Sequence, residues 1–170
     1  NSAHGFFQKL AWQNLDPVPF LVRPLRTGYL ARRLKIGRYV PDFPLALSSM
    51  PKPPRGLALE AINRFDDRFT RLWQRFAQGV GVGVERDGRY LDWRLVDKPG
   101  EDYVRLALTK GDELVAFVAF CVKEKHGGCV GYVMELLHAP GQKHAARWLL
   151  RRVIAEMARA GADVALAWCL

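Results

Sequence analysis

The spacing of apolar residues switches along the chain between the period of a strand and the period of a helix. Residues 57–62 have the composition of a short strand, and residues 87–96 have the pattern of a helix that Pro99 and Gly100 would end. The clearest helix is predicted at 65–76, where all apolar side chains fall on one face: Phe65, Phe69, Leu72, Trp73 and Phe76. This part of the chain therefore predicts a strand followed by two helices.

The second half of the sequence predicts a group of strands interrupted by one helix. Strands are indicated at 103–109, 114–122, 129–137 and 164–170. The first two flank the turn residues 110–112 and so predict an antiparallel hairpin. Residues 145–160 carry a helical apolar face, and Gly161 is placed to end that helix. The last strand is mostly apolar, which suits a buried position inside a sheet.

The first third of the chain differs from the rest in charge and in proline content. The net charge of the whole chain is +9, and residues 1–56 hold nine Lys and Arg against two Asp and Glu. Five prolines within residues 41–56 exclude a regular helix or a central strand there. Before them, residues 2–12 predict a short helix, 17–22 an extended segment and 23–38 a basic helix. Such a basic region can meet nucleic acid, anionic lipid or an acidic partner, or can be an ordinary solvated surface.

The composition is that of a globular protein of one domain, or of one domain with a piece of another. The chain has 170 residues, of which 49% are hydrophobic and 25% are charged. No apolar run approaches the ~20 residues of a membrane-spanning helix, so we expect no membrane contact. Cys121, Cys129 and Cys169 have neither disulfide nor zinc spacing. They predict buried thiols in a reducing compartment, and hence a cytoplasmic location.

The predicted order of strand, two helices, three antiparallel strands, helix and strand resembles that of the GNAT (N-acetyltransferase) superfamily. The segments that carry the resemblance are FDDRFTRLWQRF (65–76), RDGRYLDWRLVDKPGEDY (86–103) and the strand, loop and helix at 129–160. Together they look like bacterial GNAT-like proteins. The resemblance implies an α/β (α+β) fold with a mixed, mostly antiparallel sheet and helices on both faces.

A second resemblance divides the chain into parts. Residues 1–25, NSAHGFFQKLAWQNLDPVPFLVRPL, look like the closing helix and strand of a GNAT domain. We therefore expect such a closing piece at 1–27, a basic, proline-rich linker at 28–54, and at 55–170 a GNAT-like N-acyltransferase domain that lacks its last helix and strands. Either the chain is an internal piece of a tandem-GNAT protein, or its first part completes the sheet beside the last strand. That completion would be a circular permutation within the chain, or a strand exchange in a homodimer. Some segment should cover this strand, because an unpaired apolar strand is an aggregation-prone edge.

A strand that runs through a short loop into a helix suits a phosphate-bearing ligand, because the first N–H groups of a helix have no intrahelical partner. The resemblance narrows that ligand to acetyl-CoA, whose pantetheine would pair with the backbone around Met134, Leu136 and Leu137. Its pyrophosphate would meet the loop and helix start made of Gly141, Gln142, Lys143, His144, Ala145, Ala146 and Arg147.

This loop departs from the pattern of the family, which is Gln/Arg-x-x-Gly-x-Gly/Ala. Of its defining positions, the small residue Ala146 matches. His144 replaces a glycine over which the phosphates pass closely, and a Cβ there can block them. In the other direction, Lys143, His144 and Arg147 add positive charge that favours an anion.

The resemblance also assigns two catalytic residues. Glu135 would be the general base that deprotonates an amine acceptor, and burial in its apolar strand would raise the pKa of its carboxyl. Tyr132 would be the acid that protonates the leaving thiolate. The alternatives are a Glu135 that strand alternation turns to solvent and a Tyr132 that only packs.

Arginines and tryptophans on the predicted helices have simpler expected roles. Arg89 and Arg94 are expected to pair with Asp92 and Asp97, the alternative being contact with an acidic substrate. Four tryptophans are expected in the core: Trp73, Trp93, Trp148 and Trp168.

The sequence predicts an N-acetyltransferase that moves an acetyl group from acetyl-CoA to a small-molecule amine. The alternative is a catalytically silent GNAT-like module that binds a partner or supports a larger enzyme. A third interpretation, a nucleic-acid-binding module, depends on the basic first third alone, and we do not expect nucleic acid as the partner.

Overall fold

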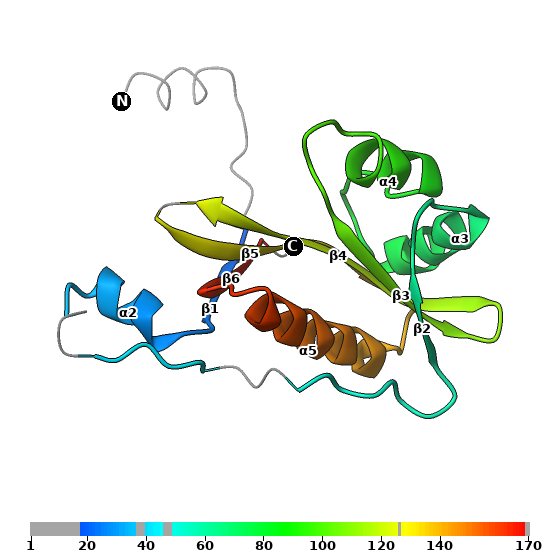
Figure 1. Ribbon diagram of the computed structural model, residues 1–170. Helices are drawn as coiled ribbons and strands as arrows, with labels where there is room; N and C mark the ends of the chain where they lie inside the picture. Colours follow the sequence, from blue (N-terminus) through cyan, green and yellow to red (C-terminus); the bar gives the residue numbers. More distant parts are fainter. Residues whose placement is uncertain (1–17, 37–39, 46–48, 126, 169–170) are drawn as a thin grey trace, which may run out of the picture.

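In the computed structural model, six strands form one mixed sheet with helices on both of its faces (Figure 1). The structure describes residues 18–36, 40–45, 49–125 and 127–168. Within them the strand order is β1-β6-β5-β4-β3-β2. Neighbouring strands are antiparallel except for β5 and β6, which are parallel. The predicted fold class is therefore confirmed.

From residue 57 onward the elements occur where the apolar pattern predicts them. The basic helix predicted at 23–38 starts too early and is too long, because residues 20–24 pair with the last strand and the helix occupies only Thr27–Arg33. The strands are β1 (Phe20–Pro24), β2 (Ala58–Ala61), β3 (Val104–Lys110), β4 (Glu113–Lys125), β5 (Gly128–His138) and β6 (Val164–Trp168). The helices are α2 (Thr27–Arg33), α3 (Asp67–Phe76), α4 (Gly88–Leu95) and α5 (Lys143–Arg159). The helix predicted at 2–12 lies outside the described residues. None of the helices in the described part of the chain is both long and apolar enough to cross a membrane.

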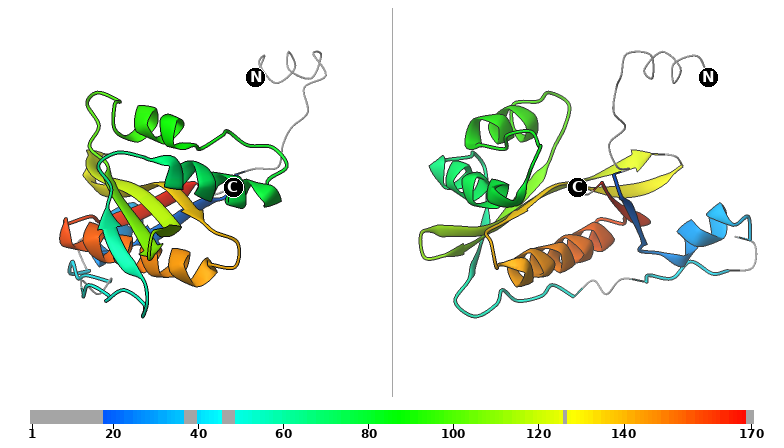
Figure 2. Two further views of the ribbon diagram at one scale, coloured as in Figure 1. Left: turned by 90° about the vertical axis from the view of Figure 1, so that its right-hand side faces the viewer. Right: turned by 180° about the vertical axis from the view of Figure 1, so that it is seen from behind.

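Helices α3 and α4 cover one face of the sheet, as the left view of Figure 2 shows. Each helix begins at an aspartate that accepts a backbone N–H, because the first N–H groups of a helix need an outside partner. Asp66 accepts from Arg68 N at 2.9 Å, and Asp87 accepts from Tyr90 N at 2.7 Å. The core of this face includes three mutually perpendicular rings, Phe65, Phe69 and Phe117. The apolar stripe predicted at 65–76 is thus the surface that α3 buries.

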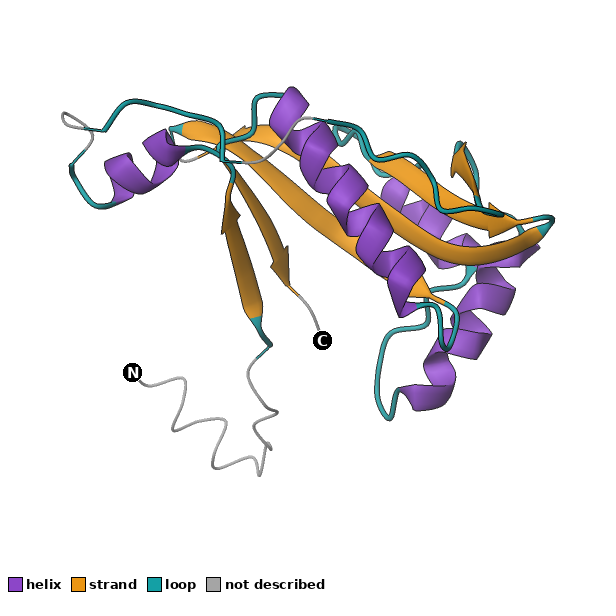
Figure 3. Ribbon diagram, turned by 90° about the horizontal axis from the view of Figure 1, so that it is seen from below, coloured by secondary structure: helices purple, strands orange, loops and turns teal. Residues whose placement is uncertain are grey.

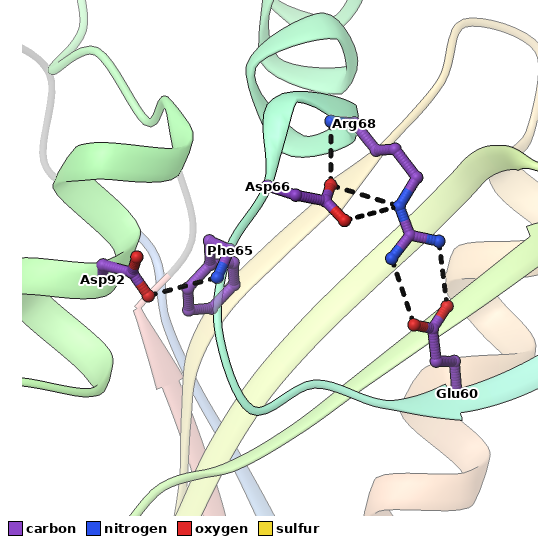
Figure 4. Close-up of polar contacts among 5 residues, drawn as sticks. All are labelled: Glu60, Phe65, Asp66, Arg68 and Asp92. Atoms are coloured by element: carbon purple, nitrogen blue, oxygen red, sulfur yellow. Dashed lines mark hydrogen bonds and ion pairs between the residues drawn. The ribbon is translucent and has the colours of Figure 1, made fainter.

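Polar contacts also join α3 and α4 to the edge of the sheet (Figure 4). Arg68 of α3 donates to both carboxylate oxygens of Glu60 in β2, at 3.1 and 3.0 Å, and to Asp66. Asp92 of α4 accepts the N–H of Phe65 at 3.1 Å. These contacts join β2, α3 and α4 into one unit.

Helix α5 covers the opposite face and buries Leu149, Val153 and Met157 completely. Gly131 of β5 lies directly beneath Met157, where a Cβ would come 2.5 Å from the methionine sulfur. The helix begins at Lys143, two residues before the predicted start. The reason is a turn in which Gln142 N donates to Ala139 O at 3.0 Å and Gly141 has a φ of 76°.

The first described residues belong to the same sheet. Strand β1 is antiparallel to β6, with Phe20 opposite Trp168 and Pro24 opposite Val164. Leu25, which follows β1, is buried in the core beneath α5. Strand β1 therefore occupies the position beside the last strand that one of the two alternatives assigns to it. The division into 1–27, 28–54 and 55–170 stays a prediction.

Two of the four tryptophans predicted to be core residues are exposed. Trp93, on the outer side of α4, is 66% exposed, and Trp168, at the end of β6, is 76% exposed. Apolar character predicts burial only where another element covers the position. Trp168 contacts Phe20 of β1 near the edge of the sheet.

Candidate functional site

The parallel strands β5 and β6 separate halfway along β5. They pair from Val130 opposite Val164 to Val133 opposite Ala167, whereas β5 continues to His138. In Figure 3, β1 and β6 leave the direction of the other strands. From Met134 onward, the backbone edge of β5 that faces β6 has no strand partner among the described residues. Free backbone groups at an opened edge can pair with an extended ligand.

A β-bulge lies at the point where the two strands separate. Ala119 of β4 is opposite Glu135, and the next residue, Phe120, is opposite Val133, so Met134 is the extra residue of β5. Met134 packs against the core under α3, and Glu135 contacts arginines from α4 and from the residues just before it. Consecutive residues therefore lie on one face, which regular alternation does not allow.

The bulge divides the predicted residues of β5 between the two faces. Tyr132, Met134, Glu135 and Leu137 lie on the face of α3 and α4, whereas Leu136 packs under α5. Tyr132 is half-buried there and sits opposite Cys121 of β4. The structure thus brings the two predicted catalytic side chains, Tyr132 and Glu135, to the same side of the sheet.

Glu135 is only 8% exposed and lies between two arginines. Its Oε2 is 3.0 Å from Nε of Arg86, and its Oε1 is 3.5 Å from Nε of Arg94. Burial raises the pKa of the Glu135 carboxyl above its ordinary value, and the two guanidinium groups offset part of that rise. The Glu135 carboxyl is therefore buried, as expected from the sequence for a general base. It is also paired with Arg86 and Arg94.

The predicted pairing of Arg94 with Asp92 and Asp97 is wrong. Both aspartates instead contact Arg64, at 3.7 and 2.7 Å. Arg94 instead lies toward the sheet, with its Nε 3.5 Å from Oε1 of the buried Glu135 carboxylate. Asp92 is engaged elsewhere, because it accepts the N–H of Phe65. Arg89, by contrast, is exposed.

Aromatic rings hold both arginines beside Glu135. The guanidinium carbon of Arg86 is 5.6 Å from the ring centroid of Trp73, and that of Arg94 is 6.0 Å from the ring of Tyr90. Arg94 also donates to the hydroxyl of Tyr90 at 3.2 Å. Arg86 does not stand out in the sequence, because it lies just before the cap residue of α4 and has no periodic pattern to mark it.

The loop that follows β5 is short and leads directly into α5. Gly141 and Gln142 are exposed in the turn, and Ala145 and Ala146 are buried small residues at the start of the helix. Lys143, His144 and Arg147 are exposed in the first turns. His144 is thus the second helical residue rather than a loop residue. The opened edge of β5, the small side chains and the basic helix start together fit an acyl-CoA.

Two hollows of the described surface lie elsewhere. Cavities of about 490 and 400 Å³ lie between α3, the turn after β3 and the loop after β5. They share Arg75, Gln78 and Glu113, and neither is lined by Tyr132 or Glu135. The opened edge of β5 is therefore a separate feature of the sheet.

The fold is that of known acyltransferases. No protein-family model matches the sequence, and no curated protein matches it significantly. Among solved structures, an aminoglycoside acetyltransferase from an uncultured soil metagenomic sample, in complex with sisomicin, has a TM-score of 0.50 at 12% identity. The match covers 68% of this chain and 78% of that one. The glucosamine-6-phosphate N-acetyltransferase of Arabidopsis thaliana has the same TM-score and identity, over 67% of this chain and 82% of its own.

A larger protein matches more of the chain. N-myristoyltransferase of Saccharomyces cerevisiae with bound myristoyl-CoA has a TM-score of 0.59 at 11% identity, over 88% of this chain. This chain spans 41% of the length of that enzyme. Residues 55–170 alone are about two thirds of the chain, so this match includes part of the first 54 residues. These neighbours show that the chain has a GNAT-like fold.

Proposed function

We propose that this protein is an acyl-CoA-dependent N-acyltransferase that binds its donor where β5 and β6 separate. The observation that carries the proposal is the end of β5–β6 pairing at Val133, next to the buried carboxylate of Glu135. An extended donor on the free edge of β5 would present its acyl group to the face that holds Glu135. No other part of the described chain combines an open strand edge, a helix start and a buried acid.

The chemistry would be direct transfer. The amine nitrogen of the acceptor forms a bond to the thioester carbonyl carbon, and the carbon–sulfur bond breaks. Glu135 takes the proton that the amine loses, and Tyr132 gives a proton to the leaving thiolate. Most of the acceleration would come from holding donor and acceptor in contact, since an amine and a thioester are already reactive partners.

The structural neighbours support the class of donor. One of them contains bound myristoyl-CoA, and others are N-acetyltransferases. Acetyl-CoA is the donor that we propose, together with a small-molecule amine as acceptor.

Calorimetric titration with acetyl-CoA tests the proposal. We expect acetyl-CoA to bind, and bound acetyl-CoA should raise the melting temperature by mass action. When an acceptor is also present, free CoA should be released. His144→Glu should weaken binding about tenfold, because it places a negative charge beside the phosphates. The same change suits the helix start, so the melting temperature should not fall. Arg151→Gln, an exposed site in the middle of α5 with an equal change in charge, is the matched control.

Two results would count against this assignment. Absence of binding at millimolar acetyl-CoA would end it. Equal affinity in His144→Glu and Arg151→Gln would move the donor away from the start of α5.

One observation favours a second candidate, a catalytically silent module. Glu135 is already paired with two arginines, as a purely structural carboxylate is. Such a module would bind acetyl-CoA or a partner without turnover. Acetyl-CoA binding without CoA release in a broad screen of amines would support this second candidate.

A further inference from the structure

The cluster around Glu135 has more positive than negative charge. Two guanidinium groups, Arg86 and Arg94, meet one carboxylate in a region that is largely shielded from water. The side chain of Arg86 is 24% exposed and that of Arg94 is 37% exposed, so each keeps one side open. The Glu135 side chain is only 7% exposed. An anion from outside can therefore reach the arginines more readily than it can reach Glu135.

Both arginines retain unused hydrogen-bond donors. Each contacts Glu135 through Nε, and in neither does that nitrogen have a well-aligned hydrogen bond. One terminal nitrogen of Arg86 is 3.5 Å from the carbonyl of Val84, and one of Arg94 bonds Tyr90. Their second terminal nitrogens have no partner in the described ranges of the chain. A guanidinium with free N–H groups recognises carboxylate or phosphate.

The surroundings limit how these arginines can move. Arg86 lies over the ring of Trp73 and Arg94 over the ring of Tyr90, and these contacts restrain both side chains. Restraint of this kind lowers the entropy that a ligand would have to remove on binding. The two arginines are therefore preorganised for ligand binding.

We propose that Arg86 and Arg94 form an anion subsite for the acceptor, so that the substrate is an amine that also carries a carboxylate or phosphate. This inference depends on the proposed function, because the subsite lies beside the carboxylate that we assign as the base. It adds the class of acceptor, which the fold does not give.

The subsite also connects acceptor binding to the base. Glu135 and the incoming anion compete for the same two guanidinium groups. An anion that takes N–H donors from Arg86 and Arg94 weakens their hold on Glu135, which is then free to accept a proton from the amine. The carboxylate is thus held in its pairs until an acceptor arrives.

Because the anion and Glu135 compete, anion affinity should change in opposite directions when an arginine is replaced and when Glu135 is replaced. Inorganic phosphate and acetate, each titrated at constant ionic strength without CoA, are the probes. Arg86→Gln and Arg94→Gln should each weaken anion binding about tenfold, through loss of a charged hydrogen-bond donor. Glu135→Gln should tighten it roughly fivefold, the scale of one unit charge a few ångströms away in water. Arg89→Gln, on the exposed side of the same helix, is the matched control and should change nothing.

Each outcome decides the proposal. Unchanged or weaker binding in Glu135→Gln overturns it, as does an equal loss in Arg89→Gln and Arg94→Gln. If Arg86→Gln does not fold, Glu135→Gln and Arg94→Gln still decide. Phosphate bound more tightly than acetate assigns a phosphorylated amine, and the reverse assigns an amino acid-like one.

The result is separable from that of the donor test. Anion binding with these signs but without acetyl-CoA affinity keeps the subsite and ends the proposed function. Acetyl-CoA binding without any anion effect ends the subsite alone.

Discussion

Nε of Arg86 lies 3.0 Å from Oε2 of Glu135, and this contact ties the segment before α4 to the middle of the sheet. Glu135 is in β5 at the bulge, where the strand loses its partner β6. Arg86 is therefore fixed at a place on the sheet where an acid is buried beside a strand edge that has no partner among the described residues.

Glu135 should make the stability of the protein depend on pH. Burial raises the pKa of its carboxyl above the ordinary 4.5, so the folded state holds this proton more tightly than the unfolded state does. Over the window that starts near pH 4.5 and ends above the folded-state pKa, the unfolded chain binds fewer protons. The free energy of unfolding from this group therefore falls as pH rises. Each unit of the shift is worth about 1.4 kcal/mol.

Urea unfolding of the wild type and of Glu135→Gln between about pH 4 and pH 7 measures this dependence. The stability of the wild type relative to the variant should decrease with rising pH. Glu85→Gln, at an exposed site, should follow the wild type. A relative stability that increases with pH would show that the arginines, and not burial, dominate the pKa of Glu135.

Gly131→Ala should destabilise the protein by about 1–3 kcal/mol, the usual cost of overpacking a core. The added Cβ would come 2.5 Å from Sδ and 2.8 Å from Cγ of Met157, which is completely buried under α5. Chemical denaturation measures the loss. Gly81→Ala is the control, because no atom lies within 4 Å of a Cβ added at that position. Equal stability of the two variants would mean that Met157 moves aside without cost.

Arg68→Lys should lower the free energy of unfolding by about 0.5–1 kcal/mol, although both side chains keep a positive charge. Arg68 uses two nitrogens on Glu60 and its Nε on Asp66, a fork that lysine cannot form (Figure 4). Thermal melts at low salt measure the difference. Arg71→Lys, exposed on the same helix, should be neutral. A loss that is the same for Arg68 and Arg71 would show that the fork to Glu60 and Asp66 contributes nothing of its own.

Trp148→Phe should loosen the proline-rich segment from α5. The indole Nε1 of Trp148 donates to the carbonyl of Lys52 at 2.8 Å, a bond worth about 0.5–1.5 kcal/mol. An arginine-specific protease should cleave after Arg55 faster in this variant than in the wild type. Trp93→Phe is the control, since that side chain is exposed on α4. Unchanged cleavage would mean that other contacts hold the segment.

The candidate site was predictable only in part. Glu135 stands out in the sequence because it is the one carboxylate in an apolar strand, and its burial agrees with that reasoning. The bulge at Met134 was not predictable, because it is set by the register of β5 against β4. The partners of Glu135 were missed for a related reason. Arg86 has no local pattern, and Arg94 has local aspartates that look like better partners than a distant glutamate.

The sequence by itself determined the order and type of the elements from residue 57 onward and the amphipathic faces that they bury. Those features depend on spacing within a few residues, which the chain carries locally. Tertiary structure decided where β5 and β6 separate, which face Glu135 occupies and which two arginines meet it. These outcomes depend on strand register and on contacts between segments far apart in the chain, and no local pattern encodes them.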